Sequence, residues 1–383
     1  MEKSNGKKRH ILRNTMISIF IVIAVLAIVV FVMLKNSVLI SFPELKGSPE
    51  VGEWYAITPE EAKSSDGSEW NGFIRLGSEN KVMVYFFGGG ASINEYTAAH
   101  PKDFYADVVK NQDFVAKMGI ASDTEDNPFK DWTILVLPYS TGDFHSGTGE
   151  YAYSDDKGNS KTLYHYGYTN FSLFMKEAVK YTGTPDTLLV TGFSAGGFGT
   201  SLLADDVIDY YPSTSNVTVA VDSSLLLTDD WQDISENVWK SPQPISERLN
   251  TDNIVLDSLT ALSDKRGDSV KILFDSSVRD GELAKWQAYL DHGEMSATDK
   301  SGDVFQSNLK AMVEGLQNNI PGVGIYIWDG LSYNKKLNLT QHTIISSNVF
   351  DKLNGKKSIS DWILDAVNGD VHNYGIELLE KEY

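Results

Sequence analysis

Apolar and polar residues follow one another along this chain in blocks that predict a parallel sheet covered by helices. Short apolar runs, each followed within two residues by Gly, Asp or Pro, are separated by longer amphipathic stretches. This alternation favours the α/β fold class, with functional groups where the strands end. The predicted strands are Val82–Phe87, Thr133–Leu137, Thr187–Val190, Val217–Val221, Val270–Phe274 and Gly324–Trp328.

Helical periodicity appears between these runs. Phe171–Tyr181 precedes the third run, and Phe198–Tyr211 follows it with apolar residues at helical spacing. Near the C-terminus, Ser360 is the expected cap of a helix that runs to Val367. The stretch Asp222–Ser269 is polar and irregular, so it is either a lid over the site or an ordinary connection.

The N-terminal segment predicts where the chain sits. Met16–Leu34 is an unbroken apolar run of nineteen residues, enough to span a bilayer core of roughly 30 Å. The basic residues of the tail 1–15 are expected to stay in the cytoplasm, so 35–50 would be a linker and 51–383 an extracellular domain. We therefore expect a single-pass signal anchor in the cell membrane. The alternative is a cleaved signal peptide and a secreted protein, although Lys35-Asn36-Ser37 is a poor cleavage site.

Composition then narrows the class of function. The formal net charge of −19 argues against a nucleic-acid partner and is typical of a solvated, repulsive surface. The chain has no cysteine, which excludes disulfides, thiol nucleophiles and thiolate metal sites. The spacing of its other potential ligands predicts no metal site, and no cofactor is expected.

The pentapeptide Gly192-Phe193-Ser194-Ala195-Gly196 is the candidate for the reactive site. It lies between a predicted strand and a predicted helix, where a serine on a sharp turn exposes its hydroxyl group. Flanking glycines are needed because a Cβ would clash across so tight a turn. A purely structural turn is the alternative, but the context favours the nucleophile of an α/β-hydrolase-like domain.

A second glycine-rich element supports this interpretation. Gly88, Gly89 and Gly90 follow the first predicted strand, where such folds place a donor to the oxyanion. We expect backbone N–H groups of Gly89, Gly90 or Ala91 to act together with that of Ala195. A tight turn without a ligand is the alternative, and a phosphate site is disfavoured because no Lys-Ser/Thr pair follows the glycines.

A nucleophilic serine needs a histidine to accept its proton. In this fold the chain order is serine, acid, histidine, which leaves His292, His342 and His372. His342 follows the last predicted strand and is the expected base. His292 lies at an apparent helix end, and His372 follows the C-terminal helix.

The acid is expected after the penultimate strand, which selects Asp275. Asp222 ends the preceding strand and is the main rival, with a position in the pocket or a structural role near the nucleophile as its alternatives. Asp280 and Glu282 lie a few residues beyond Asp275.

Several pieces of the chain together resemble the pectin acetylesterase/Notum family of carboxylesterases. The resemblance implies an α/β-hydrolase-like fold and a triad that maps onto Ser194, Asp275 and His342. It extends from about Val82 to the C-terminal helix. The matching pieces are Phe87–Gly90, Pro138–His145, Gly192–Gly197, Val221–Ser223, Leu273–Asp275 and Gln341–Ile345.

The chain also departs from the family pattern. Ala91 and Ser92 stand where members commonly have Trp and Cys, and Ser140 replaces a frequent Cys. The substrate is therefore not carried over from either the pectin-directed or the protein-directed members. His145 belongs to the loop beside the expected site, as a pocket residue or as a hydrogen-bonded structural histidine.

These observations predict a serine carboxylesterase that works through an acyl-enzyme without a metal. The expected substrate is an O-acetyl or other acyl ester on extracellular carbohydrate, or another small ester. Two alternatives are a catalytically silent glycan-binding protein of the cell surface and an acyltransferase on the same fold.

Overall fold

The computed structural model describes residues 42–109, 115–353 and 357–383. The predicted anchor, Met16–Leu34, and the tail before it lie outside the described residues. Within the described ranges, no helix has the length and apolarity required to cross a bilayer.

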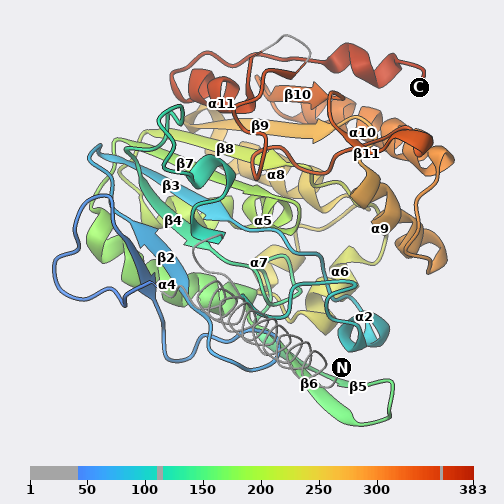
Figure 1. Ribbon diagram of the computed structural model, residues 1–383, viewed down its shortest axis with the longest axis horizontal. Coiled ribbons are helices and arrows are strands. Elements are labelled where there is room, and N and C mark those ends of the chain that lie inside the picture. Colours follow the sequence, from blue (N-terminus) through green and yellow to red (C-terminus); the bar gives the residue numbers. More distant parts are fainter. Residues whose placement is uncertain (1–41, 110–114, 354–356) are drawn as a thin grey trace, which may run out of the picture. The chain divides into compact units, whose positions relative to one another are not determined.

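A sheet of eight strands forms the centre of the described domain (Figure 1). Its order is β1-β2-β4-β3-β7-β8-β9-β10, and the six strands from β4 to β10 pair in parallel. β1 and β2 add an antiparallel edge next to β4. The strands are β1 (Trp54–Ile57), β2 (Gly72–Arg75), β3 (Lys81–Phe86), β4 (Thr133–Leu137), β7 (Thr187–Phe193), β8 (Asn216–Asp222), β9 (Val270–Ser277) and β10 (Gly324–Trp328).

All six predicted strands are confirmed, and together they form the parallel part of the sheet. Their continuous apolar runs reflect burial on both faces, since every residue of β4, β7 and β10 is buried. The mostly parallel sheet with flanking helices fits the predicted α/β-hydrolase-like fold. The register places Phe193 beside Asp222 and Asp222 beside Asp275, so the ends of three central strands meet at one edge.

Helices pack along this sheet. α5 contacts β3, β7 and β8, while α4 contacts β1 and β4 and α11 contacts β8 and β9. α8 packs on α5, and α10 packs on α8 and α9. The bounds are α4 (Gly167–Thr182), α5 (Ala195–Tyr210), α8 (Ile254–Arg266), α9 (Gly281–His292), α10 (Asp299–Asn319) and α11 (Ile359–Val367).

The three predicted helices exist, with corrections at their ends. α11 is capped by Ser358, whose side chain accepts from the N–H of Asp361, and the prediction of Ser360 as the cap was wrong. Ser360 is already helical because the capping oxygen lies three residues before the N–H that it satisfies. α8 lies inside the stretch expected to be irregular, since Asn253 caps it and its apolar residues pack on α5 and α10.

The remaining elements are short. The N-terminal end of the described chain already packs on the domain, because Pro43 and Leu45 hydrogen-bond Ala56 and Phe42 stacks on Trp54. Part of the expected linker therefore belongs to the fold. The short elements are α2 (Glu95–Ala99), η1 (Gly119–Ala121), β5 (Gly149–Ser154), β6 (Ser160–His165), α6 (Trp231–Asp233), η2 (Ile234–Val238), α7 (Gln243–Ser246), η3 (Gly267–Ser269), β11 (Ser332–Asn334), η4 (Lys335–Leu337), β12 (Leu339–Thr340) and η6 (Ile376–Glu380).

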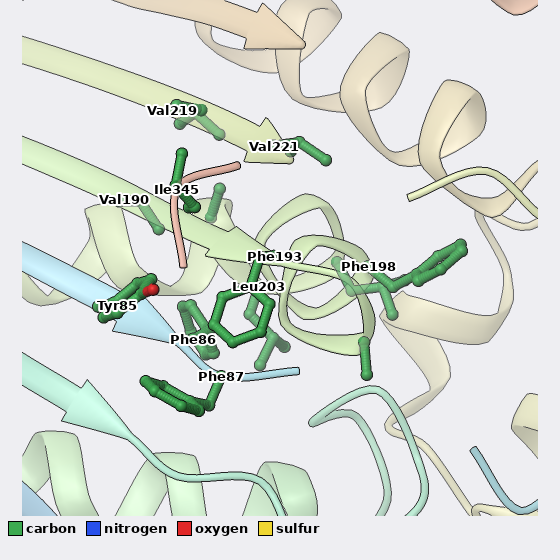
Figure 2. Close-up of a cluster of buried hydrophobic side chains, with 14 of the residues drawn as sticks. Tyr85, Phe86, Phe87, Val190, Phe193, Phe198, Leu203, Val219, Val221 and Ile345 are labelled. Carbon is green, nitrogen blue, oxygen red and sulfur yellow. The ribbon is translucent and has the colours of Figure 1, made fainter. Parts of the chain in front are cut away.

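An apolar cluster underlies the ends of the central strands. Figure 2 shows Phe87 and Phe193 near the ends of β3 and β7, with Ile345 close to β7 and β8. The rings of Phe87 and Phe193 meet edge to face with centroids 5.0 Å apart, and Ile345 is 1% exposed. Burial of this cluster fixes the loops that leave the sheet at this edge, including the loop that carries His342.

Candidate active site

Ser194 and His342 line the same cleft at the carboxyl edge of the sheet. The cleft has a volume of about 410 Å³ and is open to solvent. Its walls come from segments far apart in sequence: Gly88–Gly90, 102–106, Phe193, Ser194, Glu282, Leu283, Trp286, His342 and Thr343. None of these lining residues belongs to the segment 222–269.

The backbone of Ser194 is held in a strained turn. Its φ of 55° and ψ of −128° lie in a region that non-glycine residues rarely adopt. Its N–H donates to the carbonyl of Asp222 at 3.0 Å, and its own carbonyl accepts from Gly197 N–H and from the Ser224 hydroxyl. These bonds stabilise the sharp passage from β7 into α5 that exposes a serine side chain.

The flanking glycines are required by close backbone approach. A Cβ on Gly192 would lie 2.3 Å from the carbonyl oxygen of Gly196, and one on Gly196 would lie 2.1 Å from that of Phe86. Both distances are far inside van der Waals contact with backbone atoms that have no freedom to move. The geometry therefore explains why the motif needs glycine at both positions.

The glycine loop after β3 provides free N–H groups next to Ser194. Within the described chain, the N–H groups of Gly89, Gly90 and Ala195 have no hydrogen-bond acceptor. Ala91 was predicted as a further donor, and this prediction was wrong. Its N–H donates to the carbonyl of Phe104 at 2.9 Å, and the residue is 2% exposed.

Hydrogen bonds hold this loop in a chain without disulfides. The Tyr139 hydroxyl donates to the carbonyl of Gly90 at 2.9 Å, and the Trp239 indole N–H donates to that of Ser92 at 2.7 Å. Ser140, at the other position where cysteine is frequent, donates to the Ser64 hydroxyl at 3.1 Å. Charge-neutral hydrogen bonds from buried aromatic side chains thus fix the loop, each contributing about 1 kcal/mol.

His342 pairs with Asp280. The imidazole Nδ1–H donates to Asp280 Oδ2 at 2.7 Å, which fixes the tautomer that leaves Nε2 without a proton. Nε2 has no hydrogen-bond partner among the described residues. The prediction that Asp275 orients His342 is corrected, because Asp275 lies inside β9 with neither carboxylate oxygen bonded to the imidazole.

Local structure explains why Asp280 faces the histidine. Asp280 is the N-cap of α9, and its Oδ1 accepts from the N–H groups of Glu282 and Leu283 at 3.0 and 2.9 Å. Only Oδ2 remains for the imidazole. Aspartate is a preferred residue at an N-cap, because its side-chain oxygen accepts from the unpaired N–H groups of the first helical turn.

Arg279 brings the two segments side by side. Its N–H donates to the Thr340 hydroxyl, and the N–H of Thr340 donates back to its carbonyl at 2.9 Å. The buried guanidinium donates to the carbonyls of Asn338 and Asp299 and pairs with the carboxylates of Asp299 and Asp303. The segment that carries Asp280 is therefore tied to the residues just before His342.

The electrostatics of His342 suit a base that becomes charged during a reaction. Burial lowers the pKa of its imidazole, but the charge and hydrogen bond of Asp280 outweigh burial and leave the pKa raised above its ordinary value. A raised pKa means that the imidazolium form is stabilised where it stands. Such a side chain accepts a proton from a neighbouring hydroxyl more readily than a free histidine would.

Asp222 holds the histidine loop rather than lining the pocket, where it had been a candidate. Its Oδ2 accepts from the N–H groups of Ile344 and Ile345 at 2.8 and 2.9 Å. The two donors are the residues directly after Thr343, a β-branched residue with a φ of +61°. Asp222 thus contacts both parts of the site. Its backbone carbonyl accepts from Ser194, and its carboxylate accepts from the loop that carries His342.

Asp275 lies beside Asp222 with both carboxyl groups buried. Burial, and then the charge of Asp222, raise the pKa of Asp275 well above its usual range. Burial raises the pKa of Asp222 as well, but its two backbone N–H bonds oppose that rise, so Asp222 is the better placed of the two to be ionised. Asp275 therefore binds its proton more tightly in the folded chain than a free carboxyl group does.

This proton makes stability depend on pH. Because the folded chain binds the proton of Asp275 more tightly than the unfolded chain does, this group favours folding below the unfolded pKa of ~4 and loses that contribution as pH rises. Asp275→Asn mimics the protonated form, and its free energy of unfolding relative to wild type is expected to increase from pH 5 to pH 8. Urea unfolding at several pH values measures this, with exposed Asp252→Asn as the control. Parallel stability curves for wild type and Asp275→Asn would contradict the assignment.

His145 lies behind the glycine loop, and it does not line the cleft as a pocket residue. Its Nε2–H donates to the carbonyl of Phe87 at 2.9 Å, and its ring packs on Phe86 and Tyr139. Burial lowers its pKa to about 4, so the ring is neutral near pH 7. His145 is therefore the hydrogen-bonded structural histidine that the sequence left as an alternative.

No group of three His, Asp or Glu side chains in the described part of the chain is arranged to hold a metal ion. The cleft instead combines a serine on a strained turn, a histidine oriented by a carboxylate, and free backbone N–H groups. This set of groups is suited to acyl transfer through a covalent intermediate.

Comparison with known families bears on the same segments. A model of the family described as Pectinacetylesterase matches residues 56–254, more than half of the chain. The chain belongs to the pectinacetylesterase family. A comparison with curated proteins gives no significant match. The matched range contains the glycine loop and Ser194 but neither Asp280 nor His342, so the second half of the site rests on the geometry described above.

Family membership supports carboxylic ester hydrolysis as the general chemistry, with acetyl esters of carbohydrate as the kind of substrate. From the sequence, Asp280 was only a residue a few positions beyond Asp275. A signal was present, because Asp280-Gly281-Glu282 places a preferred N-cap residue before an acidic first helical turn. The N-cap pattern marks where the loop after β9 ends and α9 begins. It is therefore a better guide to this carboxylate than the end of the apolar run.

Proposed function

We propose that this pectinacetylesterase-family protein is a serine carboxylesterase that removes acetyl groups from carbohydrate. In this proposal Ser194 is the nucleophile, His342 the general base and Asp280 the acid that orients the histidine. The observation that carries the proposal is the 2.7 Å hydrogen bond between His342 and Asp280, with His342 and Ser194 lining one cleft.

The proposed reaction balances in two steps. The Ser194 hydroxyl proton moves to His342 Nε2 as Oγ bonds the acetyl carbon, and N–H groups of Gly89, Gly90 and Ala195 stabilise the oxyanion. The carbon–oxygen bond to the sugar then breaks, and the sugar oxygen takes the proton from the imidazolium. Water, deprotonated by His342, releases acetate and restores Ser194.

A serine-directed probe tests this proposal. We expect a fluorophosphonate to label the wild-type chain at Ser194 and to leave Ser194→Ala unlabelled. Ser201→Ala, which changes a buried serine of α5 outside the cleft, is the matched control and is expected to be labelled like wild type. Labelling that survives Ser194→Ala, or a wild type that is never labelled, would contradict the esterase and favour a silent glycan-binding protein.

Product analysis separates hydrolysis from transfer. Free acetate as the product supports the esterase, whereas acetylated sugar acceptors in place of acetate would make the chain an acyltransferase. We further propose that the catalytic domain works outside the cell membrane. The support for this location is the basic tail and the apolar run Met16–Leu34 of the sequence.

A further inference from the structure

Exposed aromatic rings gather beside the cleft. Large apolar side chains that are exposed in the described chain are few, and two of them, Tyr96 and Tyr333, contact residues of the cleft wall. Exposed aromatic residues at the edge of a pocket indicate a binding surface more often than scattered aliphatic ones do. The full set is Val51, Tyr96, Val304, Tyr333 and Tyr383.

Tyr96 extends the wall formed by Phe104. The side chain is 56% exposed, and its ring meets that of Phe104 edge to face at 5.6 Å and lies 4.2 Å from the His100 ring. Phe104 in turn packs against Trp286 at 5.5 Å, and both line the cleft. A chain of aromatic contacts therefore connects the cleft wall to the solvent-exposed ring of Tyr96.

Tyr333 extends the wall that contains Asp280. The side chain is 47% exposed, and its hydroxyl donates to Glu282 Oε2 at 3.2 Å. Its ring lies over the Cα of Gly281, since a Cβ at that position would be 2.3 Å from the ring. Glycine at 281 thus makes room for a flat ring next to the triad carboxylate, and Glu282 lines the cleft.

We propose that Tyr96 and Tyr333 bind sugar units of an uncharged, acetylated oligosaccharide on either side of the acetyl group that reaches Ser194. The C–H face of a pyranose ring is apolar and packs flat on an aromatic ring, while its hydroxyl groups need hydrogen-bond acceptors at the edge. Asp103 and Glu282 supply such acceptors on the cleft. This assignment of the substrate rests on the proposed esterase function.

The charges around the cleft favour an uncharged oligosaccharide as the substrate. Lys102 is the one Lys or Arg among the described lining residues, whereas the carboxylates of Asp103 and Glu282 line the same cleft. Lys285 lies near but pairs with Glu282 at 3.3 Å. With a net charge of −19 on the whole sequence, a polyuronate would meet repulsion both at a distance and at the cleft.

The first experiment compares substrates by kcat/KM. We expect wild type to prefer an acetylated xylo-oligosaccharide, which is uncharged, over an acetylated oligogalacturonide of equal length. Tyr96→Ala and Tyr333→Ala are each expected to lower kcat/KM about fivefold more for the xylo-oligosaccharide than for 4-nitrophenyl acetate. Val304→Ala, an exposed change on α10 outside the cleft, is expected to leave both values within twofold of wild type.

The second experiment measures binding without turnover. Ser194→Ala is titrated with the acetylated xylo-oligosaccharide, and adding Tyr96→Ala is expected to weaken Kd about fivefold. Equal losses on both substrates, preference for the oligogalacturonide, or an unchanged Kd would each overturn the proposal. Wild type that binds the oligosaccharide through Tyr96 but cleaves no ester would instead refute the esterase function and leave the sugar site standing.

Discussion

Asp280→Asn is expected to lower kcat by about 10⁴-fold with little change in KM. The asparagine oxygen is expected to keep the cap of α9, where Oδ1 of Asp280 accepts from Glu282 and Leu283. Its amide NH₂ would then face His342 and donate to Nδ1. This forces the proton onto Nε2, the atom that must be free to accept the proton of Ser194. Steady-state kinetics with an aryl acetate measure the loss.

The matched control is Asp275→Asn, the same change at the residue that the sequence selected. Because Asp275 makes no hydrogen bond to His342, its variant is expected to keep kcat within about tenfold of wild type. The pH profile gives a second readout, since loss of the Asp280 charge removes what raises the pKa of His342 and shifts the acidic limb to lower pH. A larger loss in Asp275→Asn than in Asp280→Asn would make Asp275 the triad acid.

The parallel strands were predictable because burial on both faces leaves a simple signal. A strand such as β7 has no solvent face, so all its residues are apolar or small, and the run ends where the backbone leaves the sheet. The antiparallel edge was missed because its strands are short. β1 and β2 have four residues each, and β2 ends in Arg75, whose buried side chain bonds the Lys130 carbonyl. Such short strands give no clear pattern.

The carboxylate partner of His342 was missed because polarity does not mark the end of β9. The strand continues past Asp275 through Ser276 and Ser277, which are polar but fully buried. Placing the acid at the first carboxylate after an apolar run assumes that the run and the strand end together. Here the chain leaves the sheet only near Arg279, whose buried guanidinium is held by partners twenty or more residues away along the chain. Those partners are set by tertiary structure.

The second feature that could not be predicted from the sequence is which backbone N–H groups are free to donate. Nothing in the sequence distinguishes the N–H groups of Gly89, Gly90 and Ala91. In the structure, this loop pairs with residues 104–106 through the N–H of Ala91, and the N–H groups of Gly89 and Gly90 stay free. Gly90 has a φ of +76°, and a Cβ there would lie 1.9 Å from the Phe104 carbonyl oxygen. The glycine is thus needed for the same pairing that removes Ala91 from the set of donors. The contact with Phe104, which the local sequence does not show, determines both the need for glycine at position 90 and the loss of the Ala91 donor.

Asp222→Ala is expected to lower the free energy of unfolding by about 3 kcal/mol and kcat by about 10²-fold. The change leaves the buried N–H groups of Ile344 and Ile345 without an acceptor and frees the strained Thr343 next to His342. Asp222→Asn retains a carbonyl oxygen at the same place, so it is expected to lose only about 1 kcal/mol and to keep most of kcat. Urea unfolding at pH 7 and aryl acetate kinetics on both variants measure this rescue. Equal loss of kcat in the two variants would mean that the charge of Asp222, rather than its hold on the loop, is what the reaction needs.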